Sequence, residues 1–348
     1  MDILPLHFQK ILQKVSQNLI PFHCLLEVTY RCNLKCLHCY VVRNNKNELT
    51  TKHFFDILDQ LKELGTLYLT ISGGEPLVRE DFFEIAEYAK RNNFALRIFT
   101  NAVLIDSKIA EKIKKLKPLA VEVSLYGLEK THDEITQVKG SFKKSVNGIK
   151  LLRKRNIPVL AKCTLLDRNI LEVWKLKDFV EKDLKIRMRG IGGGLAISPC
   201  DDGDLRPLNY LPTDEQLKWY MEEEKKFLKR KIKQGPIYKK SRLNFNLCGA
   251  GISGINITPH GEVNPCVQIR TRNKISEGKE IRDIWLNGKE FKLLRQTKIK
   301  DLEDCRDCEY EKYCFHCAGI SYLLTGSFTK PYPDACRQAR IRKEIYQT

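Results

Sequence analysis

The sequence has no apolar run long enough to cross a membrane. Across its 348 residues no uninterrupted hydrophobic stretch approaches the roughly 18 residues that a spanning helix needs. Residues 1–20 carry polar side chains throughout, where a secretory signal peptide would have an apolar core. These absences predict a cytoplasmic protein with no membrane association. In that reducing compartment the 13 cysteines are not expected to pair as disulfides, so metal binding or catalysis becomes their expected use.

The chain also lacks internal repeats and low-complexity segments, and its composition is that of a globular protein. A net charge of +18 would suit a nucleic-acid-binding protein, but the lysines and arginines are spread along the chain. The densest basic runs, at 112–117 and 229–231, lie in helix-like stretches and are interpreted as solvated helix faces. Nucleic-acid binding is therefore not expected, whereas an acidic substrate or partner remains open.

Short apolar runs alternate with amphipathic segments from about residue 24 onward. Strands are predicted at 25–29, 67–71, 96–99, 120–124, 159–163 and 186–188, and helices at 51–64, 81–90, 107–116, 142–155 and 170–180. Six strand–helix units in a row predict an α/β protein whose parallel sheet curls into a partial (β/α)6 TIM-type barrel. A capping box of Thr213 and Gln216 begins a charged helix that runs to about residue 234, and two short strands are predicted between 255 and 263. We assign 1–20 to an N-terminal segment, 21–240 to the barrel with this bridging helix, and 241–348 to a small cysteine-rich α+β domain.

Three cysteines, Cys32, Cys36 and Cys39, follow the first predicted strand in the pattern C-x3-C-x2-C. Three thiolates this close can bind three irons of one four-iron cluster, because cysteine sulfur suits iron–sulfur clusters. No fourth cysteine lies nearby, so one iron would keep an open position, which is typical of a catalytic site. A zinc site with three thiolates is the alternative. The location at the carboxyl end of a strand, where the active sites of barrels lie, favours catalysis.

The stretch from Cys32 to Tyr40, CNLKCLHCY, resembles the signature of the radical S-adenosylmethionine superfamily, including an aromatic-type residue, His38, before the last cysteine. The resemblance covers most of the chain. It implies that S-adenosylmethionine chelates the open iron of a 4Fe–4S cluster through its amino and carboxylate groups. One electron from an external donor such as ferredoxin or flavodoxin then splits the sulfonium and yields a 5′-deoxyadenosyl radical. This radical takes a hydrogen atom from the substrate.

Residues that follow the next strands stand where this family contacts the cofactor. The resemblance assigns such contacts to Gly73, Gly74, Glu75, Pro76, Thr100, Asn101, Ser124 and Arg187. Glycines allow a close approach of the backbone to a ligand, and the Glu75 carboxylate can meet an ammonium. The polar residues that end the third and fourth strands would contact ribose or carboxylate, with turn formation as the alternative. Arg187 would reach the cofactor carboxylate or a substrate, with a surface salt bridge as the alternative.

A second set of cysteines lies beyond residue 247: Cys248, Cys266, Cys305, Cys308, Cys314, Cys317 and Cys336. Thiolate pairs at C-x2-C spacing can hold one metal or cluster, and a zinc ribbon is the alternative. The set resembles the SPASM extension of radical S-adenosylmethionine enzymes, which holds up to two auxiliary four-iron clusters, although the last spacing here is x2 where the family usually has x3. The resemblance assigns one cluster to Cys305, Cys308, Cys314 and Cys336, and the other to Cys248, Cys266 and Cys317.

The auxiliary cluster with three thiolates lacks a fourth ligand. Its open corner would take a substrate group, water, a non-cysteine side chain or Cys200. The two other cysteines, Cys24 and Cys163, lie in predicted strands, where buried thiols are common. Cys163 and Cys200 remain open as hydrogen-atom donors or as ligands.

Relatives with this extension mostly modify peptides or proteins, so the resemblance predicts an enzyme that abstracts hydrogen from a ribosomally made peptide. The product would be a crosslink, a ring, a thioether or an inverted Cα centre. Three alternatives stay open: a haem-precursor decarboxylase, a sulfatase-maturing enzyme, and a non-catalytic iron–sulfur or zinc protein that binds RNA. The glycine motif argues against the last, and the sulfatase-maturing group has an eighth extension cysteine. About twenty residues precede the first strand, so recognition of a peptide leader would need a separate protein or the barrel rim.

Overall fold

The computed structural model describes residues 6–42, 47–189, 196–228, 243–271, 273–275, 280–302 and 304–347. All 13 cysteines and every predicted site residue lie within these ranges. The basic run at 229–231, the predicted end of the bridging helix near 234 and the predicted domain boundary at 240 lie outside them. Within the described ranges no helix is long and apolar enough to cross a membrane.

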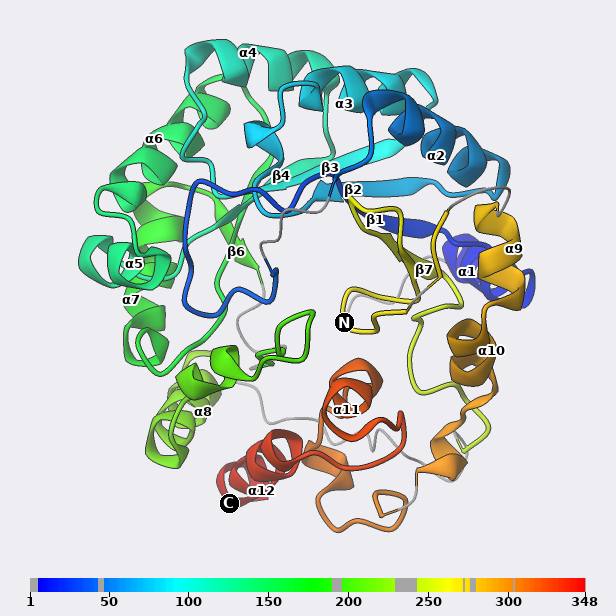
Figure 1. Ribbon diagram of the computed structural model, residues 1–348. Coiled ribbons are helices and arrows are strands. Elements are labelled where there is room, and N and C mark those ends of the chain that lie inside the picture. The colour runs from blue at the N-terminus through cyan, green and yellow to red at the C-terminus, as the bar shows by residue number, and fades with distance from the viewer. Residues whose placement is uncertain are drawn as a thin grey trace.

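An eight-stranded sheet runs through the molecule in the order β6-β5-β4-β3-β2-β1-β7-β8. Six strands pair in parallel, each with the next along the chain: β1 His23–Glu27, β2 Tyr68–Ser72, β3 Ala95–Thr100, β4 Ala120–Ser124, β5 Val159–Lys162 and β6 Arg187–Arg189. Figure 1 shows these strands as an open arc with helices along its outer side. The predicted α/β partial barrel is therefore confirmed.

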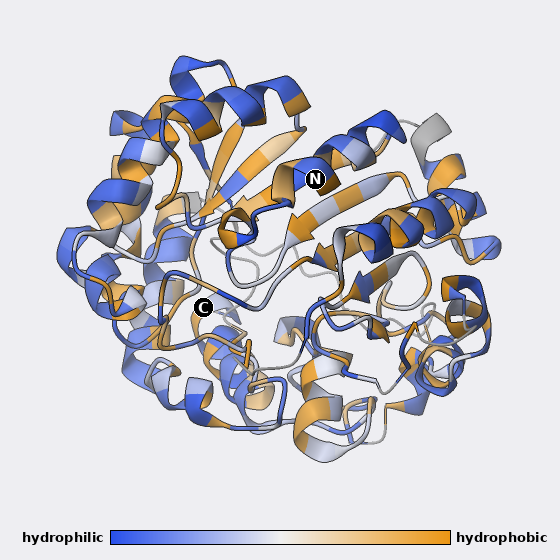
Figure 2. Ribbon diagram, turned by 45° about the horizontal axis from the view of Figure 1, so that its top comes forward, coloured by the Kyte–Doolittle hydropathy of each residue, from blue (hydrophilic) through white to orange (hydrophobic). Residues whose placement is uncertain are grey.

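Side chains alternate along each strand between two environments. Leu26, Ile71 and Ile98 are fully buried in the core between the sheet and the outer helices. Leu25 and Phe99 point the other way and line a cavity inside the arc. Figure 2 shows the same division, with hydrophobic strands beneath helices whose outer faces are hydrophilic. A slip of one residue would exchange the two environments, so burial fixes the register of the sheet.

Amphipathic helices cover the outer side of the arc: α2 Thr51–Glu63, α3 Phe82–Arg91, α4 Ser107–Leu116, α5 Glu129–Thr136, α6 Ser141–Lys154 and α7 Val173–Asp178. On α4 the side chains of Ala110, Ile113 and Leu116 are buried. The lysines of the basic run at 112–117 are exposed. This run is therefore a solvated helix face, as interpreted from the sequence.

Two helices on the outer side of the arc differ from the predictions. The helix α5 was not predicted, because its sequence EKTHDEIT carries hardly any apolar residues from which a stripe could be recognised. The helix predicted at 170–180 is divided into a 3-10 turn Ile170–Glu172, α7, and a π-helical turn Phe179–Asp183. The Asn169 side chain accepts a hydrogen bond from the Leu166 N–H at 2.7 Å and donates to the Thr164 carbonyl at 2.9 Å. These bonds hold the chain in a tight turn, so the segment after Asn169 begins as a 3-10 turn and becomes α-helical only at Val173.

The cysteine-rich segment continues the barrel sheet beyond β1. β7 Gly254–Ile257 pairs in parallel with β1, and β8 Val263–Asn264 pairs antiparallel with β7. These are the two short strands that the sequence predicts between 255 and 263. The remaining helices are α8 Asp214–Leu228, which begins with the predicted capping box, then α9 Ile281–Asn287, α10 Lys289–Gln296, α11 Ala318–Thr325 and α12 Pro333–Gln347. The helices α8 and α12 share a hydrophobic cluster. Figure 1 shows these helices across the open side of the arc, which they close.

Trp285 of α9 joins the cysteine-rich segment and the residues that follow the N-terminal helix α1 Leu6–Gln17 to the barrel core, and replacing it tests this connection. The indole is fully buried in that core, and its N–H donates to the Leu19 carbonyl at 2.5 Å. We expect Trp285→Ala to lower the free energy of unfolding by about 3–5 kcal/mol, because it leaves a large cavity. The matched control is Leu286→Ala, whose side chain is 39% exposed. Equal losses in urea unfolding of the two variants would contradict this account.

Candidate active site at the carboxyl ends of the strands

The cysteine loop, residues 28–40, leaves β1 and is held by its neighbours. Lys35 and Leu37 donate backbone hydrogen bonds to the last turn of α5, both at 3.0 Å. The Asn101 side chain, at the end of β3, donates to Asn33 Oδ1 at 2.7 Å. The N–H of Cys39 donates to the Cys36 carbonyl at 3.2 Å, which closes a turn between the last two cysteines. The loop therefore depends on α5 and β3 for its position.

The three cysteines of this loop line one cavity of ≈ 350 Å³ inside the arc. Of the predicted cofactor contacts, the same cavity is lined by Gly73, Gly74, Thr100, Asn101 and Ser124. These residues follow or end β2, β3 and β4, so residues predicted from separate strands meet at the carboxyl edge of the sheet. Glu75, Pro76 and Arg187 are not among the described lining residues, and Arg187 is exposed on the edge strand β6.

The paired glycines allow the loop after β2 to lie directly against the cysteine loop. Gly73 has a φ of +139°, and a Cβ there would lie 2.2 Å from the Thr29 carbonyl oxygen. A Cβ on Gly74 would lie 2.4 Å from the Arg31 carbonyl oxygen. The N–H of Gly74 donates to the Thr29 carbonyl at 2.7 Å. The close backbone approach that the glycines permit is thus made to the cysteine loop itself.

Glu75 is fully buried behind the cavity wall. Its carboxylate accepts hydrogen bonds from the Asn101 N–H at 2.7 Å, from Thr100 Oγ1 at 2.8 Å and from the Leu77 N–H at 3.1 Å. Burial raises the pKa of Glu75 to about 7, and these hydrogen bonds oppose the rise. The carboxylate thus fixes the end of β3, whereas the resemblance predicts that it meets the cofactor ammonium. The next residue, Pro76, is buried at the start of the turn Pro76–Val78.

Lys162, at the end of β5, lines the cavity although no motif marks it. Its ammonium lies 2.6 Å from the Glu122 carboxylate and 3.6 Å from the centre of the Phe99 ring. Arg97 and Arg189 also pair with Glu122, at 2.9 and 3.4 Å, so one buried carboxylate faces three cations. Burial is the main cause that lowers the pKa of Lys162. The excess of positive charge beside the cavity suits an anionic group, and strand alternation is the signal that could have identified Lys162.

The seven cysteines beyond residue 247 gather into the two predicted groups. Cys248, Cys266 and Cys317 lie close enough for electrostatic interaction. Burial, and then the charges of the other two thiols, raise the pKa of Cys266 to about 12. Likewise, burial is the main cause that raises the pKa of Cys314 to about 12, and the charges of Cys305, Cys336 and Cys308 add to it. Among the described residues no three His, Cys, Asp or Glu side chains converge as the ligands of one metal ion do. Several thiols grouped in this way suit a multi-iron cluster, whose cysteines bind separate irons.

The other three cysteines have separate surroundings. Cys24 is buried in the barrel core, and Cys163 packs against that core and donates to the Thr164 carbonyl at 3.5 Å. Burial raises the pKa of both thiols well above the ordinary value. Cys200 donates to the Cys39 carbonyl at 3.6 Å. Cys200 therefore lies against the cysteine loop and is not placed with the group of three auxiliary thiols.

A buried ion pair joins β1 to the cysteine-rich segment. The fully buried Glu27 carboxylate lies 3.2 Å from the Arg270 guanidinium and accepts hydrogen bonds from the Tyr40 hydroxyl and the Asn256 amide, both at 3.0 Å. Arg270 also donates to Asp201 at 2.9 Å. Burial raises the pKa of Asp201 to about 7, and Arg270 opposes the rise. This network ties together β1, β7, the cysteine loop and the segment 196–201, and no sequence motif marks it.

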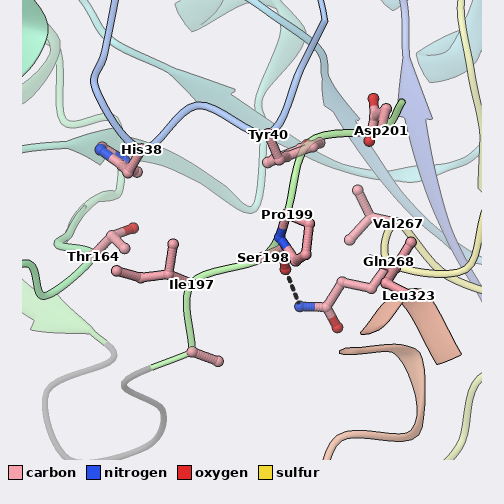
Figure 3. Close-up of a pocket in the computed structure, with 11 residues that line it drawn as sticks. His38, Tyr40, Thr164, Ile197, Ser198, Pro199, Asp201, Val267, Gln268 and Leu323 are labelled. Carbon is pink, nitrogen blue, oxygen red and sulfur yellow. Dashed lines mark hydrogen bonds between the residues drawn. The ribbon is translucent and has the colours of Figure 1, made fainter. Parts of the chain in front are cut away.

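A second cavity, of ≈ 210 Å³, shares His38, Tyr40, Thr164 and Val267 with the first. Its other walls come from the segment 196–201, Gln268 and Leu323 of α11. Figure 3 shows the cysteine-loop residues and Gln268 on different sides of this space. Because it lies between the cysteine loop and the turn that carries Cys266, we call it the bridging cavity.

The residues present fit the groups that the resemblance implies. A four-iron cluster with an open iron needs three thiolates, and the cysteine loop presents three on one cavity. The cofactor needs a partner for its carboxylate and hydroxyl or amide groups for its ribose, and Lys162, Ser124 and Asn101 line the same cavity. Of the two further thiol groups, one offers four thiols for a cluster and the other offers three.

The role of Glu75 is tested by the pH dependence of stability. Its folded-state pKa of about 7 lies above the ordinary value of 4.5. Its contribution to folding is therefore greatest below about pH 4.5 and falls as the pH rises through about 7, because the folded protein then loses a proton that it had retained. Relative to Glu75→Gln, the wild type is expected to lose about 2–3 kcal/mol between pH 5 and pH 8 in urea unfolding. A constant difference across this range would contradict the buried placement.

Two families of known proteins match this chain. Residues 26–180 match the radical SAM superfamily, and residues 248–309 match the SPASM iron–sulfur cluster-binding domain. Together the two matches span more than half of the chain, and the first contains the cysteine loop with its cavity-lining strands.

Similar proteins include enzymes and solved structures of this kind. The chain is 28% identical over 333 residues to the AdoMet-dependent heme synthase of Methanosarcina barkeri, which covers 88% of this chain and 94% of that protein. It is 26% identical over 324 residues to the mycofactocin maturase MftC of Mycobacterium tuberculosis, covering 88% of this chain and 80% of that protein. Streptococcus suis SuiB bound to S-adenosylmethionine shares the fold with a TM-score of 0.65 at 20% identity, over 97% of this chain and 84% of that one. The structure of anSMEcpe with AdoMet and the Cp18Cys peptide has a TM-score of 0.67 at 18% identity, over 93% and 96%.

The cysteine loop, the cavity beside it and the two auxiliary thiol groups agree with these matches. The chain belongs to the radical S-adenosylmethionine superfamily, carries a SPASM domain, and uses a 4Fe–4S cluster and S-adenosylmethionine together with auxiliary iron–sulfur clusters.

Proposed function

We propose that this chain abstracts a hydrogen atom from a ribosomally made peptide, with Cys32, Cys36 and Cys39 as the ligands of the cluster at which S-adenosylmethionine is cleaved. The cluster and S-adenosylmethionine, when bound, supply the 5′-deoxyadenosyl radical that removes this hydrogen atom. The chain itself holds the cofactor and positions the peptide beside it. Such positioning of the two reactants lowers the activation barrier of hydrogen abstraction.

We assign different residues of the first cavity to different groups of S-adenosylmethionine. Lys162 is the cation among the residues that line it, so we assign it to the cofactor carboxylate. The backbone carbonyls of Gly73 and Gly74 would accept hydrogen bonds from the amino group. Ser124 and Asn101 would bind the ribose hydroxyls. Glu75 acts from behind, because it holds the turn at Asn101 in place.

The size and lining of the bridging cavity are the observation that supports a peptide substrate. Its volume of ≈ 210 Å³ is below the roughly 300–1,000 Å³ of pockets that enclose a whole small molecule. It therefore suits one side chain or a short stretch of a longer chain. Its apolar walls at Ile197, Val267 and Leu323 alternate with the hydrogen-bonding groups of Ser198 and Gln268, a mixture that can hold both peptide backbone and side chain.

Several relatives support this substrate class. The chain is 29% identical over 311 residues to the subtilosin biosynthesis protein AlbA of Bacillus subtilis, and 24% identical over 355 residues to the PqqA peptide cyclase of Bradyrhizobium diazoefficiens. SuiB is known in complex with its precursor peptide SuiA.

A haem precursor is the second candidate substrate, and two observations favour it. The heme synthase of Methanosarcina barkeri aligns over 94% of its own length. The cations Arg97, Lys162 and Arg189 exceed the charge of Glu122 inside the arc, and they could meet the carboxylates of a tetrapyrrole. A whole macrocycle would, however, require the bridging cavity to widen. Membership of an enzyme superfamily argues against the non-catalytic RNA-binding alternative, and the described site offers nothing that favours sulfatase maturation.

The ligand role of the cysteine loop is tested by replacing Cys32, Cys36 and Cys39 together by Ala. We expect cleavage of S-adenosylmethionine after dithionite reduction to disappear, measured as 5′-deoxyadenosine. Iron should fall by about a third from roughly twelve atoms per chain, counting four for each of three clusters. Cys163→Ala, which removes a thiol that lines neither cavity, is the control and should keep both quantities. Cleavage at the wild-type rate by the triple variant would disprove the assignment.

The substrate class is tested by anaerobic incubation of the reduced protein with S-adenosylmethionine and either candidate precursor peptides or an iron-loaded haem precursor. We expect a peptide to lose two hydrogen atoms, or to take up deuterium from solvent without a change in bonding. Loss of carbon dioxide from the tetrapyrrole, with no change in any peptide, would favour the second candidate.

The place of substrate binding is tested with Leu323→Trp, which fills the bridging cavity. We expect it to abolish product formation but to retain cleavage of S-adenosylmethionine without substrate. Thr325→Trp adds the same bulk at the exposed end of α11 and serves as control. If the Leu323 variant still forms product at the rate of its control, the substrate does not use this cavity.

A further inference from the structure

Gln268 lies two residues after Cys266 in a tight turn. The N–H of Ile269 donates to the Cys266 carbonyl at 3.1 Å and closes this turn. The N–H of Gln268 donates to the Cys266 sulfur at 3.3 Å. The backbone of Gln268 is therefore attached to one of the three auxiliary thiols, while its side chain lines the bridging cavity.

The carboxamide of Gln268 has a partner at each end. The Cys317 thiol donates to Oε1 at 3.1 Å, and Nε2 donates to Ser198 Oγ at 2.8 Å. Figure 3 shows the second of these bonds crossing the lower side of the bridging cavity. Gln268 thus contacts two of the three thiols in its group and also the segment 196–201, which lines the same cavity.

The position of Gln268 is fixed by the helix that follows Cys317. A Cβ on Gly319 of α11 would lie 2.8 Å from the Gln268 Cβ. Only a glycine at this place lets the helix approach so closely. The contact between Gln268 and Cys317 is therefore enforced by backbone packing and does not depend on the hydrogen bond alone.

Binding of iron would reverse the direction of this hydrogen bond without breaking the contact. A cysteine that ligates iron is a thiolate and cannot donate a proton. A carboxamide offers a donor and an acceptor of nearly the same shape, so a half turn directs Nε2 at the Cys317 sulfur and Oε1 at the Ser198 hydroxyl. Both partners are then satisfied, since a hydroxyl can donate as well as accept.

We propose that Gln268 is a positioning residue through which the bridging cavity acts on the auxiliary cluster held by Cys248, Cys266 and Cys317. An N–H···S hydrogen bond to a cluster ligand stabilises the reduced cluster and raises its reduction potential. A substrate that engages Ser198 or moves the segment 196–201 changes the partner of Oε1 and so changes this hydrogen bond. The coupling gives the cluster a different potential with substrate present than without it.

This inference rests on the proposed function only in that this cysteine group holds a cluster, and it is the same for either substrate class. The experiment uses the 348-residue chain with Cys32, Cys36 and Cys39 replaced by Ala, so that only auxiliary clusters contribute. Iron content is measured first, and the midpoint potentials of both auxiliary clusters are then determined by redox titration monitored by EPR.

Four substitutions in that background separate hydrogen bonding from packing. Gln268→Leu removes the donor, and Gln268→Glu keeps the shape but replaces the donor by an acceptor, so both should lower the midpoint of one cluster. Ser198→Ala removes the hydrogen-bond partner of the Gln268 carboxamide and should change the signal of the same cluster through Gln268. Thr164→Ala removes a hydroxyl from another wall of the bridging cavity and should change neither cluster. The cluster of Cys305, Cys308, Cys314 and Cys336 is an internal reference in every sample.

The outcomes are distinguishable. Absence of auxiliary iron from the reference protein would remove the cluster assignment in the proposed function, and this inference with it. Full iron content with unchanged midpoints in both Gln268 variants would overturn the inference alone, as would an equal shift of both clusters. If one Gln268 variant fails to fold, the other, together with Ser198→Ala, still decides the question.

Discussion

The ion pair between Glu27 and Arg270 is the interaction on which the arrangement of the two cysteine regions depends. The Glu27 side chain is fully buried and that of Arg270 is 12% exposed, and removal of one partner from such a pair typically costs about 3–5 kcal/mol because the other charge is left uncompensated. Through its hydrogen bond to Tyr40 this pair holds the end of the cysteine loop, and through Asn256 it holds β7. The auxiliary thiols therefore have a defined position relative to the first three cysteines.

The two cavities are a consequence of this junction. The barrel contributes the cysteine loop and the strand ends, and the segments after β6 contribute the remaining walls of the bridging cavity. Because β7 and β8 extend the barrel sheet at β1, the cysteine-rich segment shares the barrel's own hydrogen bonds and core. Such continuity excludes a loose attachment of two separate modules.

Local patterns in the sequence predict those parts that depend on neighbouring residues. The bounds of β4 and α4 agree with the alternation and the helical periodicity, and the auxiliary cysteines group as their spacing and resemblance predict. The pairing of Glu27 with Arg270 joins residues 243 positions apart and leaves no periodic signal. Lys162 looks like any charged residue of a strand until its cavity is known. Glu75 shows a further limit, since its motif marks the position but the partners that turn its carboxylate inward come from β3.

The relatives include a heme synthase and a mycofactocin maturase, so the shared fold alone does not identify a substrate. On the barrel side of the bridging cavity, His38, Tyr40 and Thr164 also line the first cavity, beside the cysteine loop. The segment 196–201, Gln268 and Leu323 form the opposite wall and are not among the described residues that line the first cavity. Asp201 belongs to that wall and is bound by Arg270, so the ion pair that holds the cysteine loop also holds this wall of the bridging cavity.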